Sequence, residues 1–177
     1  MTSGKDSARS RNPAASRREF VTAVTAVAAA GVATTGSAQA QSGANVRHSN
    51  PSGMTQPTAY SHVVEVNGPH RLVFIAGQTG VDAGGKPTQG FRAQAMQAFE
   101  NIKTALASVG GSMDNIVRLT TYMTDLEQNA DVYREVRTSF FANKNALPAS
   151  TLLQVTRLAN PSYLIEVEAT AILPPRA

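Results

Sequence analysis

Two acidic residues, Glu166 and Glu168, occur in the alternating run LIEVEA at residues 164–169. Because successive side chains of a β-strand point to opposite faces, residues two apart share a face. A partly buried carboxylate beside a second carboxylate holds its proton more tightly, which suits acid or base chemistry on a water molecule. The alternative is a solvated strand face without a chemical role. The residues alone leave both readings open, and the pair is a candidate for acid or base chemistry.

Other reactive residue types are scarce in the sequence. It has no cysteine, which excludes disulfides, thiolate nucleophiles and cysteine metal sites. The three histidines, His48, His62 and His70, lack the spacing of known metal motifs, so we expect no metal site. His62 follows Tyr60 by two residues and is a candidate base near neutral pH, or alternatively a surface histidine on a strand.

Apolar periodicity over residues 57–177 predicts the order strand, strand, helix, strand, helix, strand, strand in a single domain. The first two strands flank Asn67-Gly68-Pro69 and are expected to form a β-hairpin. The first helix carries an apolar stripe and ends at Gly110-Gly111. The predicted strands cover residues 63–66, 72–76, 116–123, 151–156 and 163–172, and the helices 91–109 and 127–143.

This order of elements predicts an α/β fold, a two-layer sandwich of one sheet with two helices on one face. In the last strand Glu166 and Glu168 alternate with apolar residues, which places both carboxylates on the uncovered face. A small domain commonly covers such a face by association. We therefore expect a closed homo-oligomer with clefts between subunits.

Most of the net positive charge lies at the N-terminus. The sequence has a formal charge of +4, and residues 1–40 hold five basic and two acidic residues, a net +3. The remaining residues carry 11 basic and 10 acidic side chains and are nearly neutral. Because nucleic-acid binding depends on neutralising phosphates, we expect no nucleic-acid partner.

Residues 1–40 have the parts of a signal peptide: a polar basic start, an apolar run over residues 20–33, and the small-residue pattern AQA at 38–40. Arg17-Arg18 indicates the twin-arginine type, with cleavage after Ala40, a periplasmic or secreted product and no membrane attachment afterwards. The alternatives are a general secretory signal or an uncleaved tail. Residues 41–56, rich in Ser, Gly and Asn, are expected to form a flexible leader into a domain at 57–177.

Six short motifs together carry a resemblance to a known family. They are Tyr60, IAGQ at 75–78, AQA at 93–95, Asn101-Ile102, PAS at 148–150, and LIEVEA at 164–169. In this order across residues 57–173 the sequence resembles the reactive-intermediate deaminase family, called Rid, RidA or YjgF. The resemblance implies a fold similar to that of a bacterial chorismate mutase, and a homotrimer whose sheets form a central barrel. It also implies three small-molecule sites in the clefts between subunits.

The resemblance also assigns roles to single residues. Glu166 matches the family's glutamate, which orients or activates the hydrolytic water. Tyr60 matches a tyrosine that lies across the cleft from residues of the neighbouring subunit. Gly77 matches a glycine of the pocket floor, and Ala76 stands where the family often has serine.

The expected substrate-binding residues include Ser150, Thr151 and Leu152, and here the sequence departs from the family. Deaminating members have an arginine at the position of Ser150, which binds the substrate carboxylate through two parallel hydrogen bonds. Serine donates one neutral hydrogen bond and brings no charge. Arg134, near a family asparagine, is a candidate replacement cation, or alternatively a solvated helix arginine.

Two functions remain open at this point. The first is hydrolysis of an enamine or imine to a carbonyl compound and ammonia, without a cofactor, on a substrate altered by the loss of the arginine. The second is a non-catalytic trimer that binds a small molecule in the periplasm. The labels endoribonuclease and translation inhibitor, used for parts of the family, fit poorly with export and a nearly neutral domain.

Overall fold

The computed structural model of the protein describes residues 44–176, so the predicted signal peptide lies outside the described residues. In chain order the elements are β1 (Asn45–Ser49), β2 (Val63–Asn67), β3 (Arg71–Thr79), α1 (Phe91–Ser108), a 3-10 turn (Met113–Asn115), β4 (Ile116–Met123), α2 (Leu126–Ser139), β5 (Ala149–Gln154) and β6 (Ile165–Leu173). From β2 onward this is the predicted order. Neither helix of this part is long and apolar enough to cross a membrane.

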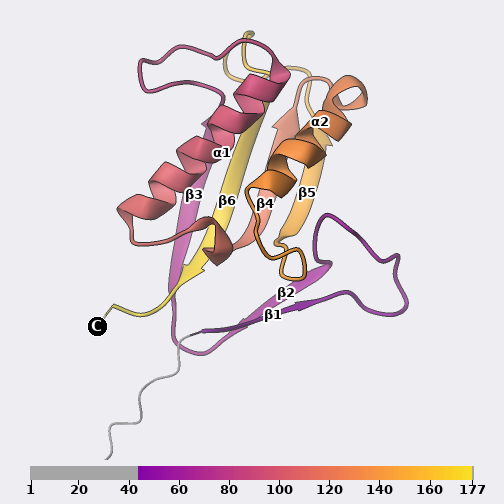
Figure 1. Ribbon diagram of the computed structural model, residues 1–177, viewed down its shortest axis with the longest axis vertical. Helices are drawn as coiled ribbons and strands as arrows, with labels where there is room; N and C mark the ends of the chain where they lie inside the picture. The colour runs from indigo at the N-terminus through magenta and orange to yellow at the C-terminus, as the bar shows by residue number, and fades with distance from the viewer. Residues whose placement is uncertain (1–43, 177) are drawn as a thin grey trace, which may run out of the picture. The chain divides into compact units, whose positions relative to one another are not determined.

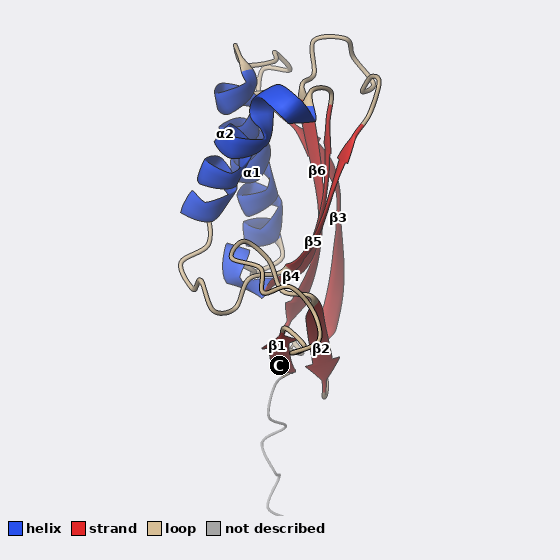
Figure 2. Ribbon diagram, turned by 90° about the vertical axis from the view of Figure 1, so that its right-hand side faces the viewer, coloured by secondary structure: helices blue, strands red, loops and turns tan. Residues whose placement is uncertain are grey.

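A four-stranded sheet in the order β3-β6-β4-β5 forms the centre of the domain. The pairs β3–β6 and β4–β6 are antiparallel, and β4–β5 is parallel. Both helices lie against one face, and within residues 44–176 no helix covers the other face (Figures 1 and 2). The predicted α/β fold with two helices on one side of a sheet is therefore confirmed.

The apolar stripe of α1 forms much of the core. Its stripe residues are buried against the sheet, and Phe99 stacks on Phe140 with ring centroids 5.1 Å apart. The helix ends where Gly110 adopts a φ of 79°, a conformation that side chains disfavour. The buried stripe residues are Phe91, Ala95, Ala98, Phe99, Ile102 and Leu106.

The predicted β-hairpin is wrong. β2 pairs with β1 and β3 pairs with β6, so the chain turns a corner at Gly68 and the two strands enter different sheets. An Asn-Gly-Pro sequence marks a turn but does not fix the partners of the flanking strands. Here a third strand, β1, decides the pairing.

β1 itself lies inside the residues predicted to form a flexible leader. Asn45–Ser49 pairs along its whole length with Val63–Asn67, and Arg47 forms an ion pair with Glu65 across the ladder. The Nδ1 atom of His48 is 2.9 Å from the carbonyl oxygen of Leu147. The structure differs from the prediction here because a polar segment can form a strand when backbone hydrogen bonds and a partner strand stabilise it.

Two amide side chains of α1 fix the ends of the strands that carry the candidate site. Gln94 is buried, donates to the carbonyl oxygens of Ser162 (2.8 Å) and Thr88 (3.2 Å), and accepts from the Leu164 N–H (2.8 Å). Asn101 donates to the carbonyl oxygens that follow the β3 bulge, Thr79 at 3.1 Å and Val81 at 2.9 Å. α1 therefore sets the positions of the end of β3 and the start of β6.

We expect Gln94→Leu to lower the free energy of unfolding by roughly 2–4 kcal/mol, because it leaves buried backbone groups without partners. Urea unfolding followed by circular dichroism measures the change. Gln89→Leu is the matched control, since Gln89 is exposed. An equal loss in both variants would show that the buried hydrogen bonds of Gln94 are not the cause.

Candidate catalytic site between two faces of the sheet

A β-bulge in β3 brings Gly77 against Glu166. Ile75 pairs with Ala169 and Gln78 pairs with Val167, so two residues of β3 lie opposite a single residue of β6. A Cβ atom on Gly77 would lie 1.9 Å from Oε1 of Glu166. Only glycine leaves room for the carboxylate at this point. The structure therefore brings together two of the predicted site residues.

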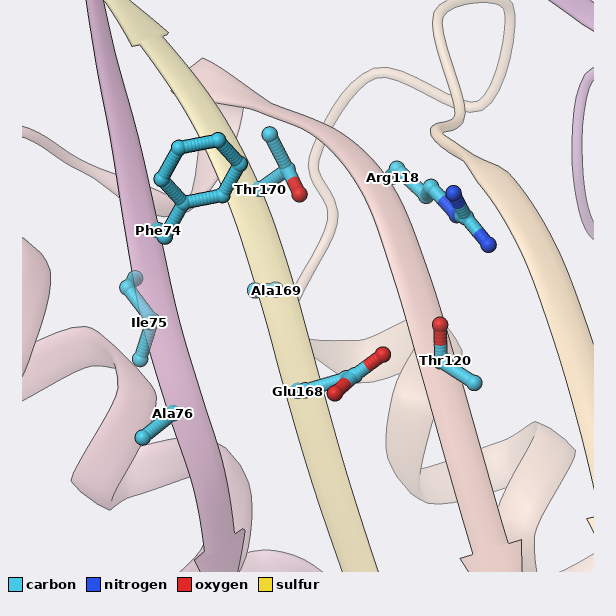
Figure 3. A pocket seen from close by; sticks show the side chains of 8 residues that line it. All are labelled: Phe74, Ile75, Ala76, Arg118, Thr120, Glu168, Ala169 and Thr170. Carbon is cyan, nitrogen blue, oxygen red and sulfur yellow. The ribbon is translucent and has the colours of Figure 1, made fainter.

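Glu166 and Glu168 lie on the face of the sheet opposite the helices, as the alternation predicts. Their neighbours Ile165, Val167 and Ala169 are buried under the helices, whereas both glutamates are partly exposed. A hollow of about 500 Å³ on this face is lined by Glu168, Thr120, Ala76 and neighbouring residues. Figure 3 shows Glu168 reaching from β6 toward Thr120 of β4, with Phe74 of β3 on the same face.

Ser150 and Leu152 lie on the other face of the sheet. In β5, Ser150 pairs with buried Leu119 and Leu152 pairs with buried Thr121, which places both side chains on the helix side. Thr151 pairs with Thr120 and points to the uncovered side, where it is exposed. Of the three predicted substrate-binding residues in β5, only Thr151 therefore shares a face with Glu166.

Tyr60 lies near the start of β5, in the loop that leads into β2. The next residue, Ser61, donates its backbone N–H to the carbonyl oxygen of Pro148 at 3.3 Å. The ring of His62 packs edge-on against Tyr60, with centroids 5.3 Å apart, and its Nε2 is 2.8 Å from the carbonyl oxygen of Thr55. The loop that carries Tyr60 thus lies beside the start of β5. We define this loop together with Ser150 as one half of the candidate site, and Gly77 with Glu166 as the other.

The half that contains Ser150 includes two residues of α2 that the sequence analysis did not single out, Tyr133 and Arg137. The phenol of Tyr133 is 2.7 Å from the hydroxyl of Thr121. Arg137 donates from Nη1 to the carbonyl oxygen of Ala59, and its guanidinium carbon is 5.5 Å from the ring centre of Phe141. Both residues are buried. Together with Val136 and Phe140 they follow the spacing i, i+3, i+4 and i+7, which defines the apolar face of the helix. This periodic spacing is visible in the sequence and could have placed both residues on the buried side.

The electrostatics of this half follow from burial. Burial raises the pKa of the Tyr133 phenol, while the charge of Arg137 and hydrogen bonds with Thr121 and Ser150 lower it. Burial also lowers the pKa of the Arg137 guanidinium, and Tyr133 acts in the opposite direction. Because arginine starts from a very high pKa, Arg137 keeps its positive charge. Tyr133 therefore has both a hydrogen-bond partner in β4, Thr121, and a nearby positive charge, Arg137.

Arg134, the predicted replacement cation, lies on the solvent side of α2 and pairs with Asp131 one turn earlier. This position favours the alternative reading of a solvated helix arginine. Among residues 44–176, no cluster of three or more histidine, aspartate or glutamate side chains is placed to hold a metal ion.

Comparison with known proteins shows to which family the chain belongs. The family model described as endoribonuclease L-PSP matches residues 53–173. The chain belongs to this family, also called RidA/YjgF. The match confirms the predicted resemblance, and it begins four residues before the predicted boundary at residue 57.

Relatives in the RidA/YjgF family include named deaminases. A RutC family protein of Aquifex aeolicus is 33% identical over 114 residues, which cover 64% of this chain and 87% of that protein. A mouse protein named 2-iminobutanoate/2-iminopropanoate deaminase is 31% identical over 118 residues, covering 66% of this chain and 82% of that protein.

Solved structures agree with the RidA/YjgF assignment. A Rid-family protein of unknown function from Yersinia pestis superposes with a TM-score of 0.67 at 33% identity, covering 73% of this chain and 99% of that one. RidA from an Antarctic Psychrobacter gives a TM-score of 0.55 at 32% identity, and the match covers 67% of this chain and 92% of that one.

We expect Gly77→Ala to leave the fold intact but to move the Glu166 carboxylate. The new Cβ would meet the end of a flexible side chain, which can rotate away at little cost in stability. Thermal unfolding and a crystal structure of the variant test both parts. Gly53→Ala is the control, because a Cβ there meets nothing within 4 Å. An unmoved carboxylate in Gly77→Ala would show that the contact does not constrain Glu166.

Proposed function

We propose that the protein hydrolyses an enamine or imine to a carbonyl compound and ammonia. The observation that carries the proposal is the Glu166 carboxylate held beside the bulge at Gly77 on the open face of the sheet. Relatives named 2-iminobutanoate/2-iminopropanoate deaminase, at 31–33% identity, support the same reaction class.

In this mechanism Glu166 takes a proton from a water molecule as the water oxygen bonds to the imine carbon. The C=N bond becomes single and gives a carbinolamine. Glu166 returns this proton to the nitrogen of the carbinolamine. It then takes the proton of the carbinolamine hydroxyl and passes it to the nitrogen as well, so that the C–N bond breaks, ammonia leaves and the C–O bond becomes double. The reaction consumes one water and needs no cofactor, and its rate depends on a carboxylate fixed near the reacting carbon.

We further propose that the complete site forms between subunits of a homotrimer. Ser150 and Glu166 lie on opposite faces of one sheet, so a single chain cannot place both beside the same ligand. The uncovered face also exposes Phe74 (76%) and Leu72 (50%), large apolar side chains that a second copy would bury. A neighbouring copy would then add its Tyr60–Ser150 half to the Glu166 half.

The substrate is proposed to be anchored differently from the 2-imino acids of the named deaminases. Ser150 stands at the position that resembles the family's carboxylate-binding arginine, and a serine hydroxyl brings no charge. A ligand held only at this position would be neutral or would gain its contacts elsewhere.

Residues 1–40 are proposed to direct export, so that the domain acts in the periplasm or outside the cell. The support comes from the sequence: Arg17-Arg18, a short apolar run and the AQA pattern before residue 41.

We expect Glu166→Gln to lower kcat for imine hydrolysis by about 100-fold or more, because the amide cannot accept the proton. The assay generates 2-iminopropanoate and a neutral imine in situ and follows ammonia release. Glu168→Gln, on the same strand and face, is the control and should change kcat by less than about tenfold. Unchanged turnover in Glu166→Gln contradicts the mechanism, and ligand binding without any turnover in the native protein would favour the non-catalytic alternative.

Phe74→Lys should convert the trimer to monomers, because a charge in the interface loses its hydration without gaining a partner. Sedimentation equilibrium measures the mass, and imine hydrolysis should fall with the loss of the trimer. Met96→Lys is the control, since Met96 is exposed (40%) on α1, away from the open face of the sheet. A native protein that sediments as a monomer would contradict the shared site.

A further inference from the structure

Tyr122 of β4 lies directly beside Glu166 on the open face of the sheet. The two residues are register partners in the antiparallel pair of β4 and β6. Thr121 and Met123, the neighbours of Tyr122, are fully buried on the helix side, so alternation turns the Tyr122 side chain to the open face. The Cβ atoms of such partners are about 4.5–5.5 Å apart, which allows both side chains to contact one small molecule.

The hydroxyl group of Tyr122 is accessible to a ligand. Its side chain is partly exposed, on a face that no helix covers within residues 44–176. The phenol of Tyr133, by contrast, is buried and bonded to Thr121, and no such hydrogen bond holds the Tyr122 hydroxyl in the described part of the chain. A phenol in this position can donate a hydrogen bond, and a proton, to a bound molecule.

The carboxylate and the phenol reach the open face from different strands. Oε1 of Glu166 lies so close to Gly77 that a Cβ atom there would collide with it, so the carboxylate leans toward β3. Tyr122 comes from β4, on the other side of β6. The next row of the same face differs, because there Glu168 reaches toward its partner Thr120 on β4 (Figure 3). A base and a proton donor therefore lie on two sides of one position.

The proposed hydrolysis requires a proton at the substrate nitrogen in both of its steps, whereas Glu166 takes its protons from oxygen. A phenol has an ordinary pKa of about 10, so it keeps its proton at neutral pH and can give it to a basic nitrogen. Thr79, the partner of Glu166 on β3, also carries a hydroxyl, but an aliphatic hydroxyl is not among the side chains that titrate. The chemistry thus favours Tyr122 as the donor.

We propose that Tyr122 is a second catalytic residue, which carries protons from Glu166 to the substrate nitrogen. As the water oxygen bonds to the imine carbon, Glu166 accepts a water proton and Tyr122 gives its phenolic proton to the nitrogen. The phenolate then regains a proton from the carboxyl group of Glu166. When the carbinolamine breaks down, Glu166 takes the hydroxyl proton and Tyr122 again protonates the nitrogen, so that the C–N electron pair leaves with ammonia. A second return of the proton restores both residues. The inference rests on the proposed function, since it names a further residue of that reaction.

The first experiment compares Tyr122→Phe with the native protein in the assay of ammonia release. We expect kcat to fall by about tenfold to 100-fold, with a much smaller change in KM. The pH profile separates a proton donor from a structural residue. In the native protein kcat should fall above about pH 10, as the phenol ionises, and this alkaline fall should be absent from the residual activity of Tyr122→Phe. Tyr163→Phe is the matched control, because Tyr163 is also partly exposed and lies just before β6, and it should keep the native kcat and profile.

A second variant keeps the size and the hydroxyl of the side chain. Replacement of Tyr122 by 3-fluorotyrosine lowers the pKa of the phenol, so the alkaline fall in kcat should move to lower pH while turnover is retained. Thermal unfolding of all three variants confirms that they are folded.

Each result has a separate meaning. Native hydrolysis with an unchanged kcat in Tyr122→Phe, or with an alkaline fall that persists in this variant or does not move in the fluorinated protein, would overturn the inference and leave the proposed function standing. A native protein without imine hydrolysis would contradict the proposed function, and the proton transfer through Tyr122 with it.

Discussion

Side-chain alternation along β5 and β6 governs how this protein can form a site. β4 lies between β5 and β6 and pairs with both, so all three strands belong to one sheet. Each of their side chains points either to the helix-covered face of this sheet or to its open face. Ser150 falls on the helix-covered face and Glu166 on the open one. Since a strand cannot turn a side chain to the other face without a shift in register, the two residues stay apart within one chain. The proposed association of chains would therefore complete the site as well as cover apolar surface.

The sequence predicts the elements whose patterns are strong. The apolar stripe of α1 and the glycines that follow it predict a helix and no other element. The alternation of apolar and polar residues in β6 correctly predicts that Ile165 and Val167 are buried. β1 and the corner at Gly68 could not be predicted in this way. A polar strand has no apolar period, and a turn sequence does not specify which strands pair. Pairing is a long-range property that local patterns do not contain.

The residues of the candidate site could also be predicted only in part. The resemblance assigned Gly77 and Glu166 to one site, but their close approach depends on the bulge in β3, which no sequence pattern predicted. Arg137 was missed because an arginine in a helix with many polar residues is ordinarily assigned to solvent. Its place on the apolar face beside Tyr133 and Val136 carries the information, but only the fold shows that its donors lack partners.

The place of β6 in the sheet has a consequence for how the protein folds. β6 is the last of the described strands, yet it lies between β3 and β4, which pair with it and not with each other. Arg71 at the start of β3 pairs with Leu173 near the end of the chain. During synthesis the sheet therefore remains in two unconnected parts until the final strand emerges. Such non-local closure slows folding and leaves strand edges open for longer, so the interval before closure is when the chain most needs protection from aggregation.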